Sequence, residues 1–119
     1  MLIKSFKDLT VWQRSIELVA ETYIITKKFP KSEEYGLSSQ MRRASIAIPS
    51  NIAEGYRRQG LKEYIQFLFI ANASASELET QLIISKRIYP NIDYHKIDSL
   101  LNEVLRMLTS MISKLKSKK

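Results

Sequence analysis

The chain has 119 residues, the size of one domain, and it contains no cysteine, which excludes disulfides and thiolate metal sites. Hydrophobic residues make up 45% of it, as in a folded globular protein, and only three glycines and three prolines interrupt it. Nineteen lysines and arginines against twelve acidic residues give a formal charge of +7, which favours polyanionic partners. No apolar run approaches the ~20 residues that span a membrane, and the first residues do not resemble a signal peptide. We therefore expect a cytoplasmic protein without a membrane partner.

Prolines and glycines divide the chain into four long segments, in which apolar residues recur every three to four positions, the period of a helix. Asp8 and Asp93 are the expected N-caps of the first and the fourth helix. Short connections between the segments predict an all-α fold, an antiparallel up-down-up-down four-helix bundle that fills a single domain over 1–119 with a short basic C-terminal tail. The expected helices cover residues 8–29, 37–58, 61–89 and 93–116.

Pro49 lies inside the second predicted helix. Proline removes a backbone donor and clashes with the preceding turn, which bends a helix. The residues from 50 to 54 all tolerate helix, and Ile48 and Ile52 keep facing the same side across the proline. We therefore expect a continuous helix that is kinked at Pro49, and not two helices separated by a loop.

Helical-wheel positions assign a core face to each predicted helix. In the first helix Trp12 and Val19 belong to the expected core stripe, and in the third Leu68, Ala75 and Leu82 do so. Each of these helices carries a second apolar stripe that points away from the first, and a monomer would leave it in water. The alternative is that these are scattered surface side chains that need no partner. We predict an interface between copies of the chain formed by Val11, Leu18, Ile25, Ile70, Ile84 and Ile88.

No catalytic or metal site can be assembled from the sequence. His95 is the only histidine, and it stands beside Tyr94 and Lys96 without an identifiable partner for general acid–base chemistry. Metal-ligand spacings and a phosphate-binding glycine loop are absent from the sequence. We therefore expect a protein that is not an enzyme, with no catalytic, cofactor-binding or metal-binding residues and no cofactor.

Several polar residues stand among the apolar stripes of the second and third predicted helices. They could line an active site, but no nucleophile accompanies them, which favours an interhelical network of ion pairs beside Pro49. On the wheel Glu79 shares the core face of its helix, where a carboxylate requires a cation such as Arg43 or Arg58. The predicted network consists of Arg43, Asn51, Glu54, Glu77 and Glu79.

Basic residues form the candidate nucleic-acid surface. They cluster after the first predicted helix, around the second and at the C-terminus, and phosphate contacts from such residues supply affinity that is independent of base sequence. No recognition helix, zinc finger or aromatic RNA-binding motif accompanies them, so base-specific recognition is not indicated. The candidates are Lys27, Lys28, Lys31, Arg42, Arg57, Arg58, Lys62, Lys114 and Lys116.

Residues 41–58, MRRASIAIPSNIAEGYRR, resemble the signature of the bacterial 23S rRNA intervening-sequence protein family. The resemblance implies a cytoplasmic four-helix bundle protein that assembles into a homopentamer with a basic surface. A similar fold serves as the accessory protein of a reverse transcriptase in diversity-generating retroelements. The likeness extends over most of the chain, to FKDLTVW at 6–12, YGLSSQ at 35–40, YIQFL at 64–68 and SELETQL at 76–82.

Two functions are consistent with these features. In the first, a homo-oligomer of this chain binds structured RNA or other nucleic acid, with a nucleic-acid enzyme as a further partner. Five copies at +7 each would carry a charge of +35, which strengthens polyanion binding. The alternative is a protein–protein scaffold or accessory subunit, for example to a reverse transcriptase, without intrinsic nucleic-acid specificity.

Overall fold

The computed structural model describes residues 4–118, and these form four α-helices without a strand. Short 3-10 helices at Phe6–Asp8 and Lys31–Glu33 precede the first two. The expected all-α four-helix fold is confirmed. The helices are α1 at Thr10–Thr26, α2 at Leu37–Tyr56, α3 at Leu61–Ile88 and α4 at His95–Lys116.

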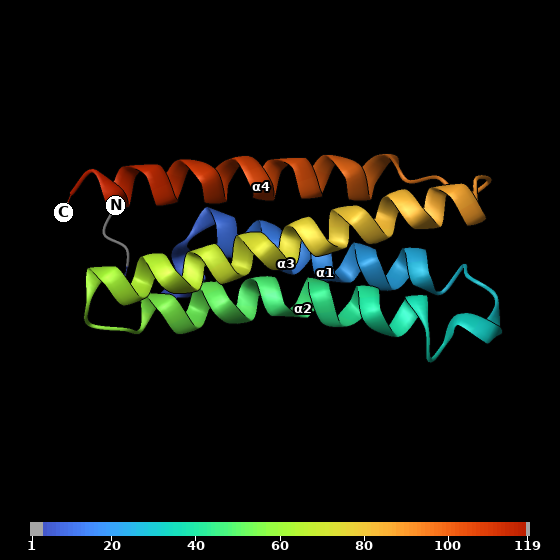
Figure 1. Ribbon diagram of the computed structural model, residues 1–119, viewed down its shortest axis with the longest axis horizontal. Coiled ribbons are helices and arrows are strands. Elements are labelled where there is room, and N and C mark those ends of the chain that lie inside the picture. The colour runs from blue at the N-terminus through green and yellow to red at the C-terminus, as the bar shows by residue number, and fades with distance from the viewer. Residues whose placement is uncertain (1–3, 119) are drawn as a thin grey trace.

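Each helix packs against two others, α1 and α3 both contacting α2 and α4. Figure 1 shows that consecutive helices run in opposite directions, so the start of α1, the α2–α3 connection and the end of α4 lie at one end of the bundle. The bundle is elongated, with extents of 46 × 25 × 22 Å. Fully buried side chains from all four helices, such as Leu18, Ile48, Leu68 and Leu108, form one core.

The helix starts differ slightly from the expected ones. Asp8 is not the N-cap of α1, because it ends the preceding 3-10 turn, where its Oδ2 accepts a hydrogen bond from the Lys4 backbone N–H at 3.1 Å. The residue at the N-cap position is Leu9. At the start of α4, Asp93 Oδ1 accepts from the His95 backbone N–H at 2.9 Å, one residue before the cap position itself. Asp93 thus satisfies one of the free donors of the first turn.

The helix α2 continues through Pro49 without a loop. Two side chains after the proline bond back to the turn before it: Ser50 Oγ donates to the Ile46 carbonyl and Asn51 Nδ2 to the Ala47 carbonyl, both at 2.8 Å. These bonds add local support where the proline lacks a donor. The continuity of the helix agrees with the expectation, and the kink angle stays a prediction.

The core face of α1 is the reverse of the predicted one. Trp12 and Val19 are only partly buried, and Ile16 on the same side is 42% exposed. The side of α1 that was predicted to form an interface is part of the core, because its three apolar residues are at most 3% exposed within the single chain. The prediction of a free face was therefore wrong for Val11, Leu18 and Ile25.

Two small polar residues explain the reversal. Ser15 and Thr22 are fully buried beside this stripe, and their hydroxyls donate to carbonyls of their own helix at 2.7 and 2.8 Å. A hydroxyl that is satisfied within its helix costs little to bury. The true core face of α1 is consequently less hydrophobic than its outer face, and a wheel that ranks faces by hydrophobicity chooses the wrong one.

The faces of α3 agree with the expectation. Leu68, Ala75 and Leu82 are buried in the core. Large apolar side chains on the other side are 42–58% exposed in the single chain. We call this set the α3 outer face; it consists of Phe69, Ile70, Ile83, Ile84 and Ile88.

Candidate nucleic-acid interface

One end of the bundle gathers exposed basic side chains from three separate segments. The segment before α1, the α2–α3 connection and the end of α4 meet there (Figure 1). Asp8, Glu54 and Glu63 are the acidic residues of the same segments. We call this region the basic end; its exposed cations are Lys4, Lys7, Arg57, Arg58, Lys62, Lys114, Lys116 and Lys118.

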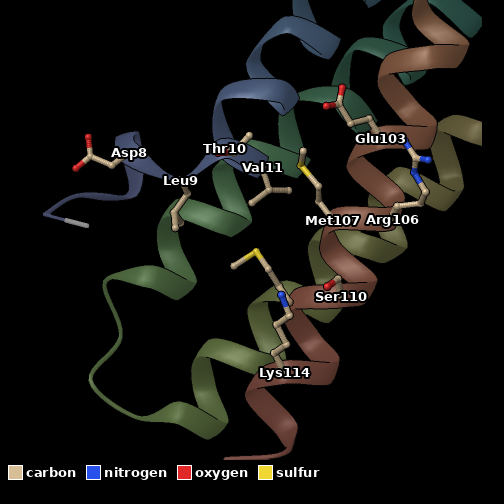
Figure 2. Close-up of a pocket in the computed structure, with 10 residues that line it drawn as sticks. Asp8, Leu9, Thr10, Val11, Glu103, Arg106, Met107, Ser110 and Lys114 are labelled. Atoms are coloured by element: carbon tan, nitrogen blue, oxygen red, sulfur yellow. The ribbon is translucent and has the colours of Figure 1, made fainter. Parts of the chain in front are cut away.

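The segments of the basic end contain more basic than acidic residues. The second half of α4 and the two residues after it contribute most of this excess. Positions 104–118 contain four basic residues and no acidic one. Arg106, Ser110 and Lys114 are spaced by four, which places them on one side of the helix. They line a pocket of about 690 Å³ between the start of α1 and α4, across which Val11 and Met107 face each other (Figure 2). The same pocket is also lined by the carboxylates Asp8 and Glu103. The excess of positive charge on α4 therefore begins after Glu103 and is greatest at the C-terminal end of the helix, which is the part that suits an anionic partner.

Aromatic rings hold several cations of the basic end in place. The Cζ of Arg57 lies 5.2 Å from the ring centroid of Phe6, and the Nζ of Lys116 lies 5.2 Å from that of Phe69. Arg58 lies over a ring as well and also forms an ion pair with Glu54, with the Nη2–Oε2 distance at 2.9 Å. Arg58 is thus partly neutralised, whereas Arg57 and Lys116 keep their charge available beside an aromatic surface.

The remaining basic candidates lie elsewhere. Lys27, Lys28 and Lys31 are exposed at the opposite end, after α1. Arg42 lines a pocket of about 260 Å³ with Lys27 and Lys31, but its Nε donates to Thr26 Oγ1 at 2.9 Å. The structure therefore brings together five of the nine predicted contacts, namely Arg57, Arg58, Lys62, Lys114 and Lys116.

The predicted interhelical polar network is not formed. Glu79 is exposed, because the core face of α3 centres on Leu78 and Leu82. Glu54 pairs along its own helix with Arg58, and Asn51 also bonds within its helix. In the described part of the chain no ion pair joins members of the set. Two of them, Arg43 and Glu77, do line one hollow between α2 and α3.

The buried carboxylate of the bundle is one that the sequence did not reveal. Glu21 on α1 is 9% exposed, and its Oε2 lies 3.8 Å from the Nζ of Lys96 on α4. Its spacing of three from Leu18 and four from Ile25 is the signal that could have identified it, once the core face of α1 was known. A second pair, Arg14 Nε and Glu103 Oε2 at 3.2 Å, also joins α1 to α4.

Two tyrosines, Tyr64 and Tyr89, have a raised pKa. Burial, with a smaller contribution from Tyr56, raises the pKa of Tyr64 above 10.0. The hydrogen bond that Tyr89 donates to Glu33 is the main cause that raises the pKa of Tyr89. Within residues 4–118 no three His, Asp or Glu side chains are grouped so that they could hold a metal ion. None of the described helices is both long and apolar enough to cross a membrane.

Comparison with known proteins identifies the family. The model of the 23S rRNA-intervening sequence protein family matches residues 7–110. A crystal structure of a protein with unknown function from the S23 ribosomal protein family of Bacteroides thetaiotaomicron is similar, with a TM-score of 0.78 and 26% identity. That match covers 87% of this chain and 98% of the other. No curated protein sequence matches. The resemblance found in the sequence is confirmed, and the chain belongs to the 23S rRNA-intervening sequence protein family.

Proposed function

We propose that the protein is a non-enzymatic, cytoplasmic homo-oligomer that binds the phosphate backbone of RNA or DNA through its basic end. The observation that carries the proposal is the second half of α4, where residues 104–118 contain no carboxylate and hold three cations of the basic end, Lys114, Lys116 and Lys118, together with Arg106. Lysine and arginine release counterions when they neutralise phosphates, which supplies affinity without reading the bases. The proposed activity is therefore general binding of a polyanion with strong dependence on salt.

A titration against labelled RNA at two salt concentrations tests this activity. If about four phosphates are contacted, affinity for a duplex should fall by roughly 100-fold between about 50 and 200 mM salt. Absence of binding at the lower concentration would contradict the proposal. A fall of less than about threefold would also contradict it, because contacts other than ion pairs would then dominate.

Two matched double variants locate the binding surface. Lys114→Gln with Lys116→Gln removes two charges from the basic end, and Lys27→Gln with Lys28→Gln removes two from the opposite end. Both pairs lie at the C-terminal end of a helix, and both change the net charge equally. We expect the first pair to weaken RNA binding at least tenfold and the second to change it by less than threefold. Equal losses would assign binding to the total charge, and not to the basic end.

Self-association through the α3 outer face is the second part of the proposal. Its five large apolar side chains are half-exposed in the single chain and form two groups on one side of α3, Phe69 with Ile70 and Ile83 with Ile84 and Ile88. Large apolar side chains that gather on one exposed side are typical of an interaction site. The family resemblance implies five copies, although the number is not set by the patch itself. Association would gather several basic ends on one particle and raise the avidity for a long polyanion.

The alternative function is a scaffold or an accessory subunit of a nucleic-acid enzyme. The α3 outer face favours it, because the same apolar surface could receive another protein. An oligomer that binds no RNA at low salt would support this alternative.

A further inference from the structure

A separate apolar pocket of about 330 Å³ lies in the seam between α1 and α2. Ile16 and Ile46 on its rim are 42% and 43% exposed, so the pocket opens to solvent. Phe6 and Trp12 meet in it edge to face, with ring centroids 5.3 Å apart and an interplanar angle of 66°. None of the described residues that line it is charged. The walls include Phe6, Trp12, Ile16, Val19, Ile46 and Pro49.

Arginines stand at both ends of this seam. Arg57, from the basic end, lies over the ring of Phe6, with its Cζ 5.2 Å from the centroid. At the other end the Cζ of Arg42 lies 4.5 Å from the ring centroid of Tyr23. Trp12 and Tyr23 are eleven positions apart on α1, or about 16 Å along the helix axis. The seam is thus an aromatic and aliphatic strip that begins beside the cations of the basic end.

We propose that this pocket takes an unpaired base of a single-stranded nucleic acid, stacked against Trp12, while the neighbouring phosphates meet Arg57 and the basic end. The inference rests on the proposed nucleic-acid binding and specifies its substrate. Proteins that bind single strands combine a cationic track with aromatic platforms, because every base offers a π face for stacking. A duplex keeps its bases stacked inside and has none to insert.

Trp12 is the only tryptophan, so its fluorescence reports on the pocket without any substitution. The probes are a uridine oligonucleotide of roughly twelve residues and an adenosine–uridine RNA duplex of the same length, whose binding is followed in parallel by anisotropy of an attached dye. We expect the single strand to quench Trp12 emission along the same curve as the anisotropy. The duplex should bind at the basic end without quenching.

Substitution of the ring provides the second measurement. Trp12→Leu keeps an apolar side chain but removes the platform, and should lower affinity for the single strand by roughly 5- to 100-fold while leaving duplex affinity within about twofold. Phe67→Leu is the matched control, since Phe67 also lies under an arginine, Arg58, but lines another part of the surface. It should leave both affinities within about twofold. Circular dichroism and thermal melting verify that each variant is folded.

The outcomes separate this inference from the proposed function. Binding of both RNAs without any change in Trp12 emission overturns the stacking site and leaves backbone binding at the basic end intact. Failure of both RNAs to bind at low salt overturns the proposed nucleic-acid function, and the stacking site with it. If Trp12 emission changes when the protein is diluted but not when RNA is added, a second copy of the chain covers the pocket. This result also overturns the stacking site.

Discussion

Arg42 on α2 lies over the ring of Tyr23 on α1, with its Cζ 4.5 Å from the ring centroid, and its Nε donates to Thr26 Oγ1 at 2.9 Å. Both contacts cross from one helix to the other near the connection that joins them. A guanidinium with two partners inside the protein is less free to meet a phosphate. We therefore expect Arg42 to stabilise the fold, although its charge alone had suggested a nucleic-acid contact.

Arg42→Ala should lower the free energy of unfolding by about 1–2 kcal/mol, because it removes a charge-assisted hydrogen bond and a cation–π contact. Urea unfolding followed by circular dichroism measures this change. Arg43→Ala is the control: Arg43 is the exposed neighbour on the same helix, and its loss should change stability by less than about 0.5 kcal/mol. Equal effects of the two substitutions would contradict a special role for Arg42.

Gly55 allows α2 and α3 to approach closely. A Cβ at this position would stand 2.7 Å from the Cβ of Phe67, closer than real side chains pack, and 3.3 Å from the Tyr64 carbonyl oxygen, which is a tight contact. Gly55→Ala should therefore destabilise the protein by about 1–2 kcal/mol, although alanine is the better helix former. Gly60→Ala is the control, since its nearest new contact would be an ordinary 3.7 Å. A stabilised Gly55→Ala protein would show that the helices separate easily at this point.

The number and the approximate limits of the helices could be predicted because helical periodicity and chain breakers are local properties of the sequence. The orientation of α1 could not. Its buried side includes Ser15 and Thr22, which satisfy their hydroxyls within the helix, while its outer side carries Trp12 and Ile16. Which side is buried depends on the tertiary neighbours, and composition ranked the two sides in the wrong order.

The candidate site shows the same division between local and tertiary information. The sequence identifies every cation, but it does not say which cations share an end of the bundle. Arg57 and Lys116 are far apart in the chain and lie at the same end of the bundle because α2 and α4 run in the same direction (Figure 1). Lys27 is separated from them by the length of α1. Helix direction therefore decides which of the predicted contacts can act on one ligand.

Tyr89 at the end of α3 joins the α1–α2 connection through a hydrogen bond to Glu33 and a stacked contact with Phe29, ring centroids 4.9 Å apart. The hydrogen bond raises the pKa of Tyr89 above its ordinary 10.0. Because the neutral phenol is the donor, this stabilisation is complete below pH 10 and is lost as the pH rises through the raised pKa, where the unfolded chain has already released its proton. Wild-type protein should be more stable than Tyr89→Phe at neutral pH.

The stability difference between wild type and Tyr89→Phe should shrink as the pH rises above 10, measured by urea unfolding at a series of pH values. Tyr35→Phe is the control, because Tyr35 is 92% exposed and its loss should change stability little at any pH. A difference for Tyr89→Phe that stays constant across this range would contradict the assigned donor. Spectrophotometric titration of the phenols provides a direct check, since Tyr89→Phe should remove a tyrosine that titrates late.

The last prediction concerns self-association, for which burial now distinguishes two substitutions that looked equivalent in the sequence. Ile84 is 44% exposed on the α3 outer face, whereas Leu18 is fully buried. Ile84→Glu should leave the helices folded and lower the mass measured by light scattering to that of one chain, because it places a charge in a dry contact. Leu18→Glu should instead unfold the protein, since an unpaired carboxylate in the core costs about 3–5 kcal/mol.

Ile24→Glu is the matched control for assembly, because Ile24 on α1 is 48% exposed and lies outside the α3 outer face. It makes the same chemical change at a similar exposure, and it should leave both the fold and the mass unchanged. Each apolar side chain that leaves water contributes at most about 1.5–3 kcal/mol, so the five members of the α3 outer face can offset much of the entropy of association. A wild-type protein that is monomeric at micromolar concentration would refute self-association. If Ile24→Glu dissociated the oligomer and Ile84→Glu did not, the contact would lie on α1, and the α3 outer face would remain for a different protein.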